Sequence, residues 1–252
     1  MKAERIWAIN SYIQIHGEVH LKDLMKLYPN LSEMTLRRDI DYLESQGYVV
    51  RTRGGAKSIR RLTQIEEDAY SKRSIENADK KIEIGRKALK FFGNATCYYI
   101  DAGTTMMHLS KLLPEEPCFI VTNAPNIALE LTRNPSANIL LLGGNLNREH
   151  YSVSGASAVE QIKSINIDVA FIAASGFSEQ SGFTNGNYNE SELKRTIISR
   201  AKQSVLLMDS SKYDRILPFT FAEIGEIDYL ISDSALPKSI IDLAKKHNTN
   251  VL

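Results

Sequence analysis

The chain has 252 residues, of which 43% are hydrophobic and 24% are charged, and its formal net charge is +1. This length allows one small and one medium domain with separate cores, and the near-neutral charge excludes a nonspecific polycation. No apolar run approaches the roughly 20 residues of a membrane helix, and residues 1–7 have no apolar signal core, so we expect no membrane partner. Cys97 and Cys118 are too few for a disulfide framework, which favours free thiols in a cytoplasmic protein.

The first 57 residues show the pattern of a winged helix-turn-helix domain. Residues 3–16 and 20–28 carry apolar side chains at spacings of three and four, which predicts two helices. Pro29 and Asn30 break the chain before a third predicted helix, residues 32–47. The second helix of a helix-turn-helix reads base edges in the major groove of DNA through its N-terminal residues. The helix at 32–47 is therefore the candidate recognition helix.

This candidate recognition helix presents different side chains on different faces. Ser32 is a suitable N-cap, because its hydroxyl can accept a hydrogen bond from an N–H group of the first turn. Met34 is expected to lie against the protein. A buried stripe is predicted at helical spacing by Leu36, Ile40 and Leu43. Three side chains then project from other faces, toward bases and nearby phosphates: Thr35, Arg37 and Arg38.

Residues 48–57 combine a short apolar strand, a basic tip and two glycines, as a β-wing requires. The cations expected to hold the DNA backbone are Arg51, Arg53 and Lys57. Residues 1–60 contain ten Lys and Arg against seven Asp and Glu, a net charge of +3, so positive charge lies where phosphate contacts are made. The alternative is a small helical bundle with a solvated Arg37–Arg38 pair. Three helices, a wing and cations at both DNA-facing points favour the winged domain.

The rest of the chain shows a different sequence pattern. Residues 58–77 are polar and lack Gly and Pro, which predicts a helical linker that carries the small domain against the large one or against a second subunit. From residue 78 to 252, apolar runs alternate with amphipathic stretches, which predicts an α/β domain with a parallel or mixed sheet and helices on both faces. The predicted strands are 97–102, 118–122, 139–142, 169–174, 205–208 and 229–232, with an edge strand at 251–252. The predicted helices are 80–92, 105–112, 127–132, 156–163, 190–202 and 237–247.

Polar loops follow five of the predicted strands. They are residues 101–105, 122–125, 143–145, 175–177 (leading to 182–185) and 209–212. Ligands of open α/β sheets bind beyond the carboxyl ends of the strands, and these loops are rich in hydroxyl and backbone donors. Together they indicate a small, oxygen-rich and anionic ligand, whereas each loop alone is also compatible with an ordinary turn.

One helix adds a carboxylate and an ammonium group, Glu190 and Lys194, spaced i to i+4. They could face a sugar hydroxyl and a phosphate, or form an exposed pair that stabilises the helix by about 0.2–0.5 kcal/mol. The five histidines show no metal-ligand spacing, so we expect no metal and no cofactor.

The chain resembles the DeoR family of bacterial transcriptional regulators over nearly its whole length. The resemblance is carried at the front by Ser32–Leu43 and by the Arg-Thr-Arg-Gly-Gly-Ala run at 51–56. Behind these, it is carried by Lys81 and Ile84, the Asp-Ala-Gly-Thr-Thr run at 101–105, Thr122-Asn123, Leu142-Gly-Gly, Gly182-Phe-Thr, Glu190 with Lys194-Arg195, and the Asp-Ser-Ser-Lys run at 209–212.

This resemblance implies an effector domain similar to ribose-phosphate isomerase and related CoA-transferase-like folds. Members of the family usually repress sugar-catabolism operons and are released by a phosphorylated sugar. Position by position, the resemblance implies an effector pocket formed by Asp101, Gly103, Thr104, Thr105, Asn123, Gly143, Glu190, Lys194 and Lys212.

The leading hypothesis is therefore a DNA-binding repressor, released by a phosphorylated sugar, that binds double-stranded operator DNA as a dimer or larger homo-oligomer. Two alternatives remain open: a sugar-phosphate isomerase or hydrolase with an attached DNA-binding head, and an activator of the same family. The sequence does not identify the sugar. Candidates for discriminating its hydroxyls are Arg148, His150, Tyr151, Asn185, Asn187 and Tyr188, of which we expect His150 to be a surface loop residue.

Overall fold

A computed structural model describes residues 2–45, 48–52, 54–58, 68–93 and 95–252. The chain divides into two compact units, Met1–Glu66 and Glu67–Leu252, which are described separately below. The predicted linker of residues 58–77 spans this division, and its residues 59–67 lie outside the described part. No helix in the described part is both long enough and apolar enough to cross a lipid bilayer.

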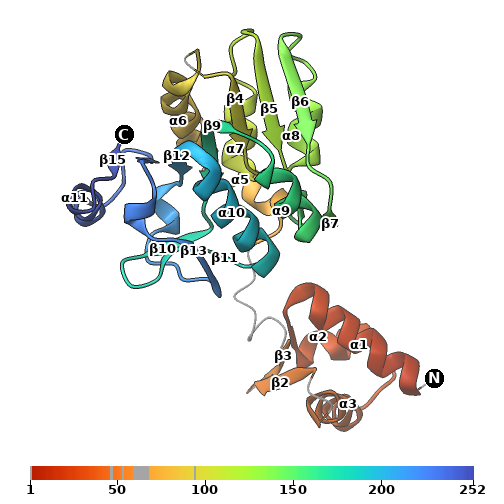
Figure 1. The fold of residues 1–252 in the computed structure, drawn as a ribbon. Coiled ribbons are helices and arrows are strands. Elements are labelled where there is room, and N and C mark those ends of the chain that lie inside the picture. The colour runs from red at the N-terminus through yellow and green to blue at the C-terminus, as the bar shows by residue number, and fades with distance from the viewer. Residues whose placement is uncertain (1, 46–47, 53, 59–67, 94) are drawn as a thin grey trace. The chain divides into compact units, whose positions relative to one another are not determined.

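The first unit is a winged helix-turn-helix (Figure 1). Its elements are α1 (Lys2–His16), β1 (Glu18–His20), α2 (Leu21–Leu27), α3 (Glu33–Ser45), β2 (Val49–Thr52) and β3 (Gly55–Ser58). The three strands form an antiparallel sheet in the order β1-β3-β2, in which β2 and β3 are the wing. Strand β1 was not predicted, because three residues are too few to show an alternating pattern, and His20 ends β1 instead of beginning a helix.

The core of this unit confirms the predicted stripe on α3. Leu36, Ile40 and Leu43 are buried, and the Thr35 N–H donates to the Ser32 hydroxyl at 3.3 Å, as expected for the N-cap. Met34 differs from the prediction, because its side chain is 60% exposed. Met34 precedes the buried stripe by two residues, and two residues correspond to about 200° around a helix. It therefore faces away from the core.

A buried ion pair joins the first and third helices. Asp39 of α3 is 2% exposed and accepts from Arg5 of α1 through both oxygens, at 2.7 Å from Nε and 3.0 Å from Nη2. The hydrogen bond with Asp39 raises the pKa of Arg5 above its ordinary value. Because Asp39 occupies a core-facing position of α3, the pair fixes how α3 lies on α1.

The second unit contains a seven-stranded sheet in which every strand pairing is parallel (Figure 1). Its strand order is β15-β14-β12-β9-β4-β5-β6. The bounds are β4 Cys97–Ile100, β5 Cys118–Thr122, β6 Ala137–Leu141, β9 Ile167–Ala173, β12 Ala201–Leu207, β14 Tyr229–Ile231 and β15 Asn250–Val251. These strands confirm the predicted runs, and the predicted α/β class with them.

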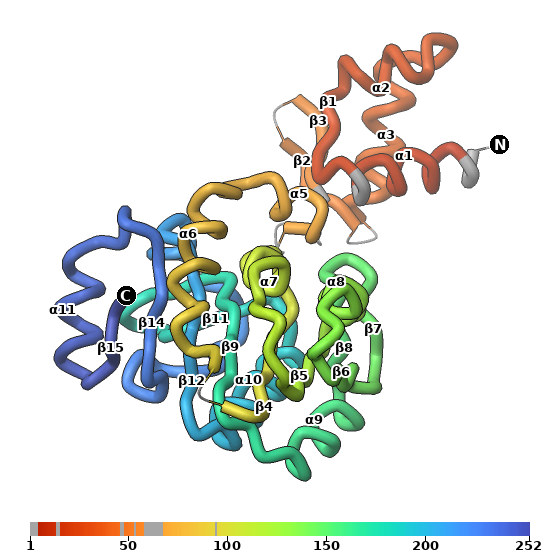
Figure 2. Tube along the Cα trace, turned by 90° about the horizontal axis from the view of Figure 1, so that it is seen from above, coloured from red at the N-terminus to blue at the C-terminus, as the bar shows by residue number. Residues whose placement is uncertain are grey.

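Helices cover both faces of this sheet (Figure 2). Alternate residues of one strand serve the two faces: Phe171 packs in a core with α6, α7 and α8, whereas Ala170 and Ile172 pack in a core with α9, α10 and α11. The helix bounds are α5 Tyr70–Ile75, α6 Ala78–Ala88, α7 Thr104–Ser110, α8 Pro125–Leu131, α9 Ala156–Lys163, α10 Tyr188–Arg200 and α11 Lys238–Lys246.

Two small antiparallel additions were not predicted. β7 (Asn145–Asn147) pairs with β8 (Ser152–Ser154), and β10 (Gly176–Ser178), β11 (Gly182–Asn185) and β13 (Phe219–Ala222) form a three-stranded sheet. Each strand has only three or four residues and is flanked by turn-forming residues, so the sequence resembles loops at these positions. Both additions follow the carboxyl ends of sheet strands, where the predicted ligand site lies.

The Arg5–Asp39 pair should be a main determinant of the stability of the first unit. Replacing Arg5 with Met leaves the buried Asp39 carboxylate without its cation, which should lower the free energy of unfolding by about 1–3 kcal/mol. Trp7 is the only tryptophan of the chain and lies in α1, so its fluorescence during urea unfolding reports on this unit. The matched control is Lys26→Met, which removes an exposed pair with Asp23 and should change stability by less than about 0.5 kcal/mol. Equal effects of the two variants would contradict this role.

Candidate functional site

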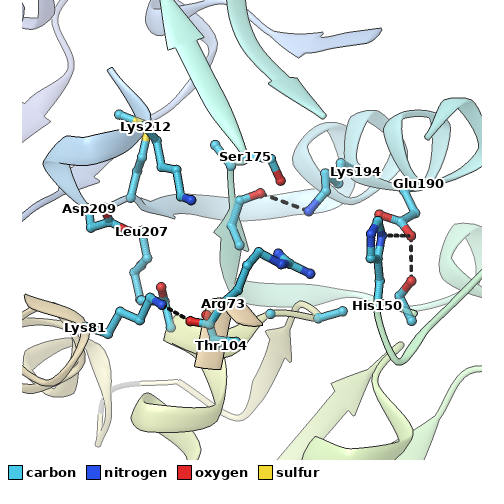
Figure 3. Close-up of a pocket in the computed structure, with 17 residues that line it drawn as sticks. Arg73, Lys81, Thr104, His150, Ser175, Glu190, Lys194, Leu207, Asp209 and Lys212 are labelled. Atoms are coloured by element: carbon cyan, nitrogen blue, oxygen red, sulfur yellow. Dashed lines mark hydrogen bonds and ion pairs between the residues drawn. The ribbon is translucent and has the colours of Figure 1, made fainter. Parts of the chain in front are cut away.

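A pocket in the second unit lies at the carboxyl ends of β4, β9 and β12 (Figure 3). The space between its lining atoms is about 590 Å³, part of it open to solvent. Parallel strands bring their carboxyl ends to one edge of the sheet, so the loops that follow them converge. The lining side chains with polar groups are Arg73, Lys81, Thr104, Thr105, His150, Ser152, Ser175, Glu190, Lys194, Asp209 and Lys212.

Four cationic side chains line this pocket: Arg73, Lys81, Lys194 and Lys212. Lys81 is 3% exposed and donates to two backbone carbonyl groups, those of Arg73 and of Glu76, the latter at 2.6 Å. Burial lowers the pKa of Lys81, with Lys212 and Arg73 adding to this effect and Asp209 opposing it. An anion placed among these cations would remove part of their mutual repulsion, so the pocket has the electrostatic character of a phosphate site.

Lys194 is held by a carboxylate behind the lining. Its Nζ forms an ion pair with Asp101 and donates to the Ala173 carbonyl at 2.9 Å. Asp101 also accepts from the Ala173 N–H at 3.0 Å. Burial raises the pKa of Asp101, and the charge of Lys194 opposes that rise. Asp101 therefore orients the Lys194 ammonium group and does not itself line the pocket.

Glu190 lies at the opposite end of the pocket from Lys81 and Lys212 (Figure 3). Ser152 donates to Glu190 Oε1 at 2.5 Å, and His150 Nδ1 lies 3.7 Å from the same oxygen. Burial acts to raise the pKa of Glu190, but His150, Ser152 and Lys194 together lower it below its ordinary value. An ionised Glu190 is an acceptor for hydroxyl groups of a ligand. His150 is 12% exposed and lines the pocket, so the prediction of a surface loop residue is wrong.

The structure places the nine predicted effector residues in two groups. Six of them line the pocket: Gly103, Thr104, Thr105, Glu190, Lys194 and Lys212. Asp101 lies behind the lining and is linked to the pocket by its ion pair with Lys194. Asn123 lies outside the lining, where its side chain donates to the Val153 carbonyl at 3.1 Å and supports β8 next to Ser152. Gly143 also lies outside the lining and exchanges two hydrogen bonds with the Gln161 side chain.

Sequence reasoning missed several lining residues. Arg73 lies on α5, in the stretch predicted only as a linker, and Ser152 lies on the unpredicted strand β8. Lys81 belongs to the motifs that carry the family resemblance. Ser175 and Asp209 lie in the polar loops 175–177 and 209–212, so the sequence pattern indicated the position of all three residues near a ligand site. Arg73 and Ser152 enter the pocket through tertiary packing, which no local pattern records.

The predicted DNA contacts lie on α3 and the wing. Arg37 pairs with Glu33 at 2.6 Å, Arg51 with Asp41 at 2.6 Å, and Lys57 with Glu18 at 3.0 Å. All six partners are well exposed, so these pairs contribute little stability and can exchange for phosphate at small cost. Arg38 is exposed and has no ion pair within the described part of the unit, and Thr35 shares a hydrogen bond with Ser32 at 2.9 Å. Arg53 lies outside the described residues.

A winged helix-turn-helix joined to an α/β unit with a charged pocket defines a DNA-binding regulator with a sensor domain. The comparison with family models agrees: residues 5–61 match the DeoR-like helix-turn-helix domain, and residues 76–234 match the DeoR C terminal sensor domain. The chain belongs to the DeoR family of transcriptional regulators, as its sequence resemblance predicted.

Curated relatives are similar over the full length. The chain is 33% identical over 249 residues to the HTH-type transcriptional repressor GlcR of Bacillus subtilis, covering 99% of this chain and 95% of that protein. It is 29% identical to the HTH-type transcriptional regulator IolR of the same organism, covering 100% and 99%. Among solved structures, the sorbitol operon regulator SorC from Klebsiella pneumoniae matches 96% of this chain and 98% of its own, at 11% identity and a TM-score of 0.44.

Removing Lys194 should destabilise the second unit in a pH-dependent way. Lys194→Met leaves Asp101 buried without its cation, which should cost about 3–5 kcal/mol of unfolding free energy near pH 8. The pKa of Asp101 is already raised by burial and would rise further in this variant. The penalty is present above that pKa and is relieved as pH falls through it, because the carboxyl is then neutral, so the destabilisation should be smaller at pH 5.

The measurement is urea unfolding followed by far-UV circular dichroism at both pH values. The matched control is Lys163→Met, which removes an exposed pair with Glu160 and should have little effect at either pH. An Lys194→Met penalty that is the same at pH 5 and pH 8 would contradict the coupling to Asp101.

Proposed function

We propose that this chain is a repressor of a sugar-catabolism operon, which binds operator DNA through its first unit and leaves it when a phosphorylated sugar occupies the pocket of its second unit. The observation that carries the proposal is the placement of four cationic side chains in one pocket, together with the carboxylates of Glu190 and Asp209. The curated relative GlcR is named a transcriptional repressor, which supports repression over activation for this chain. The free thiols Cys97 and Cys118 fit the reducing cytoplasm, where such a regulator would act.

The two ends of the pocket fit the two parts of such a ligand. Lys81 and Lys212 lie at one end and Glu190 at the other, with Arg73 between them (Figure 3). A phosphate group placed between Lys81, Lys212 and Arg73 gains charge-assisted hydrogen bonds from three sides. The sugar hydroxyls then reach Glu190, which accepts from them. The hydroxyls of Thr104 and Ser175 complete the polar lining.

The ligand can influence DNA binding through α5. This helix is the first of the second unit, and only residues 59–69 separate it from the wing in the chain. Lys81 holds the last turn of α5 through the carbonyls of Arg73 and Glu76, and the Arg73 side chain points into the pocket (Figure 3). A phosphate bound to both Arg73 and Lys81 therefore favours one placement of α5. The shift in DNA affinity equals the difference in ligand affinity between the two placements.

The first unit would bind DNA with α3 in the major groove. Thr35, Arg37 and Arg38 would meet bases and nearby phosphates, while Arg51, Arg53 and Lys57 of the wing would hold the backbone. A single winged unit makes few contacts, so we propose that a homo-oligomer, at least a dimer, reads two half-sites spaced by about 10 base pairs or a multiple of it.

The DNA assignment is tested with the double variant Arg37→Ala/Arg38→Ala and a duplex of the native upstream region. Loss of two cations and of one bidentate base contact, worth about 1–3 kcal/mol, should weaken binding at least tenfold and reduce its salt dependence. The measurement is fluorescence anisotropy across a series of salt concentrations. Arg133→Ala/Lys163→Ala removes two exposed cations of the second unit and is the matched control. Normal affinity of the Arg37/Arg38 variant would contradict the assignment of α3.

The ligand assignment is tested with pentose and hexose phosphates, their unphosphorylated sugars and inorganic phosphate, each assayed by thermal shift and calorimetry. We expect one phosphorylated sugar to bind saturably without turnover and to release the duplex. Saturable binding with no effect on DNA would contradict the regulatory role, and product formation would favour an enzyme.

The route through α5 is tested with two variants that each remove one pocket cation. Lys212→Met and Arg73→Ala should both weaken binding of that sugar phosphate by about tenfold, the loss of one charge-assisted hydrogen bond. At saturating ligand, Lys212→Met should still release DNA, because α5 keeps its own contact, whereas Arg73→Ala should remain bound. Equal release by the two saturated variants would contradict a route through α5.

A further inference from the structure

The recognition helix carries an exposed apolar side chain where a polar surface is expected. Met34 lies in the first turn of α3 and is 60% exposed. Trp7 and Tyr48, two of the several other exposed apolar side chains of this unit, pack against each other at 5.3 Å between ring centroids. Met34 instead projects from the turn with which a helix-turn-helix reads bases.

The position of Met34 on the helix follows from the helical repeat. Leu36, Ile40 and Leu43 define the buried side of α3. At about 100° per residue, Met34 and Arg38 lie on the opposite side, one turn apart and one above the other. Met34 is thus at the centre of the face that α3 turns away from its own core.

The charged neighbours on this face leave Met34 uncovered. Arg37 is turned to Glu33 at 2.6 Å, and Asp41 is turned to Arg51 of the wing at 2.6 Å. Neither pair extends over Met34, whose exposure places most of its side chain in solvent. An apolar group in this position gains free energy only when a partner covers it.

The major groove offers one apolar group on its base edges, the C5-methyl of thymine. We propose that Met34 is a specificity-determining residue that contacts a thymine methyl group in each half-site. The methionine side chain is flexible and polarisable, which suits contact with a small methyl group. Arg38, about 6 Å further along the helix, would then contact a group within about two base pairs of that thymine. This inference rests on the proposed DNA-binding function of α3.

The test removes only the methyl group. A tight-binding duplex is selected from a random pool with the full chain, and each thymine is then replaced singly by deoxyuridine, which keeps every hydrogen-bonding group. For the wild-type chain, one position per half-site should lose about fourfold in affinity, the value for one buried methyl group. With Met34→Ala, deoxyuridine and thymine should bind equally at that position, while the other positions behave as in the wild type.

Two further variants make the test specific. Met34→Leu keeps an apolar side chain and should retain the preference for thymine over deoxyuridine. Met25→Ala removes an exposed methionine of α2 and should change no position. Met34 is exposed, so its variants should fold normally, which the Trp7 fluorescence unfolding curve checks.

Three outcomes would overturn the inference in distinguishable ways. If Met34→Ala weakens binding equally on every duplex, the Met34 side chain contacts the DNA backbone and not a thymine methyl group. Tight DNA binding with no deoxyuridine-sensitive position would show that thymine methyls are not read. Failure of the wild-type chain to select any duplex would overturn the proposed function itself, and the Met34 contact with it.

Discussion

The mutual repulsion of cations in the sensor pocket is the constraint on which the rest of this site depends. Arg73, Lys81, Lys194 and Lys212 converge there because the parallel sheet brings its carboxyl ends to one edge and α5 lies beside that edge. Their charges are costly to bury together. The chain offsets this cost in two different ways, and the difference decides which charge is left for a ligand.

Lys194 has a full counter-charge in Asp101, so it can be held permanently in the folded state. Lys81 is held mainly by the carbonyls of Arg73 and Glu76, which are dipoles and leave its charge in place. The lowered pKa of Lys81 reflects this incomplete compensation. An anionic ligand therefore gains most at the Lys81 end, while Lys194 contributes a fixed donor near Glu190. The same asymmetry gives the pocket its polarity, with the charge of Lys81 at one end and the Glu190 carboxylate at the other.

More of the fold than of the pocket could be predicted from the sequence. Repeated apolar runs identified the strands of the main sheet, since a buried parallel strand is apolar along its length, and the stripe of Leu36, Ile40 and Leu43 identified α3. Strand β8 was missed because three residues carry no periodicity, and with it the inward position of Ser152. The role of Arg73 was missed and the burial of His150 was not expected, because both residues are covered by segments distant in sequence. Met34 was misassigned because its apolar character was taken as evidence of burial.

Under the proposed function, the position of Arg73 on α5 sets an upper limit to the change in DNA affinity that a ligand can cause. Ligand binding can bias α5 by no more than the free energy of the contacts that differ between its two placements. A charge-assisted hydrogen bond to Arg73 contributes about 1.5–3 kcal/mol, which corresponds to roughly a 10- to 150-fold change in DNA affinity. Coupling between two binding sites usually falls in this range. The contact with Arg73 alone would therefore be enough for a regulatory response of ordinary size. A stronger response would need a second contact that α5 makes only when ligand is bound, or the addition of such couplings across the subunits of an oligomer.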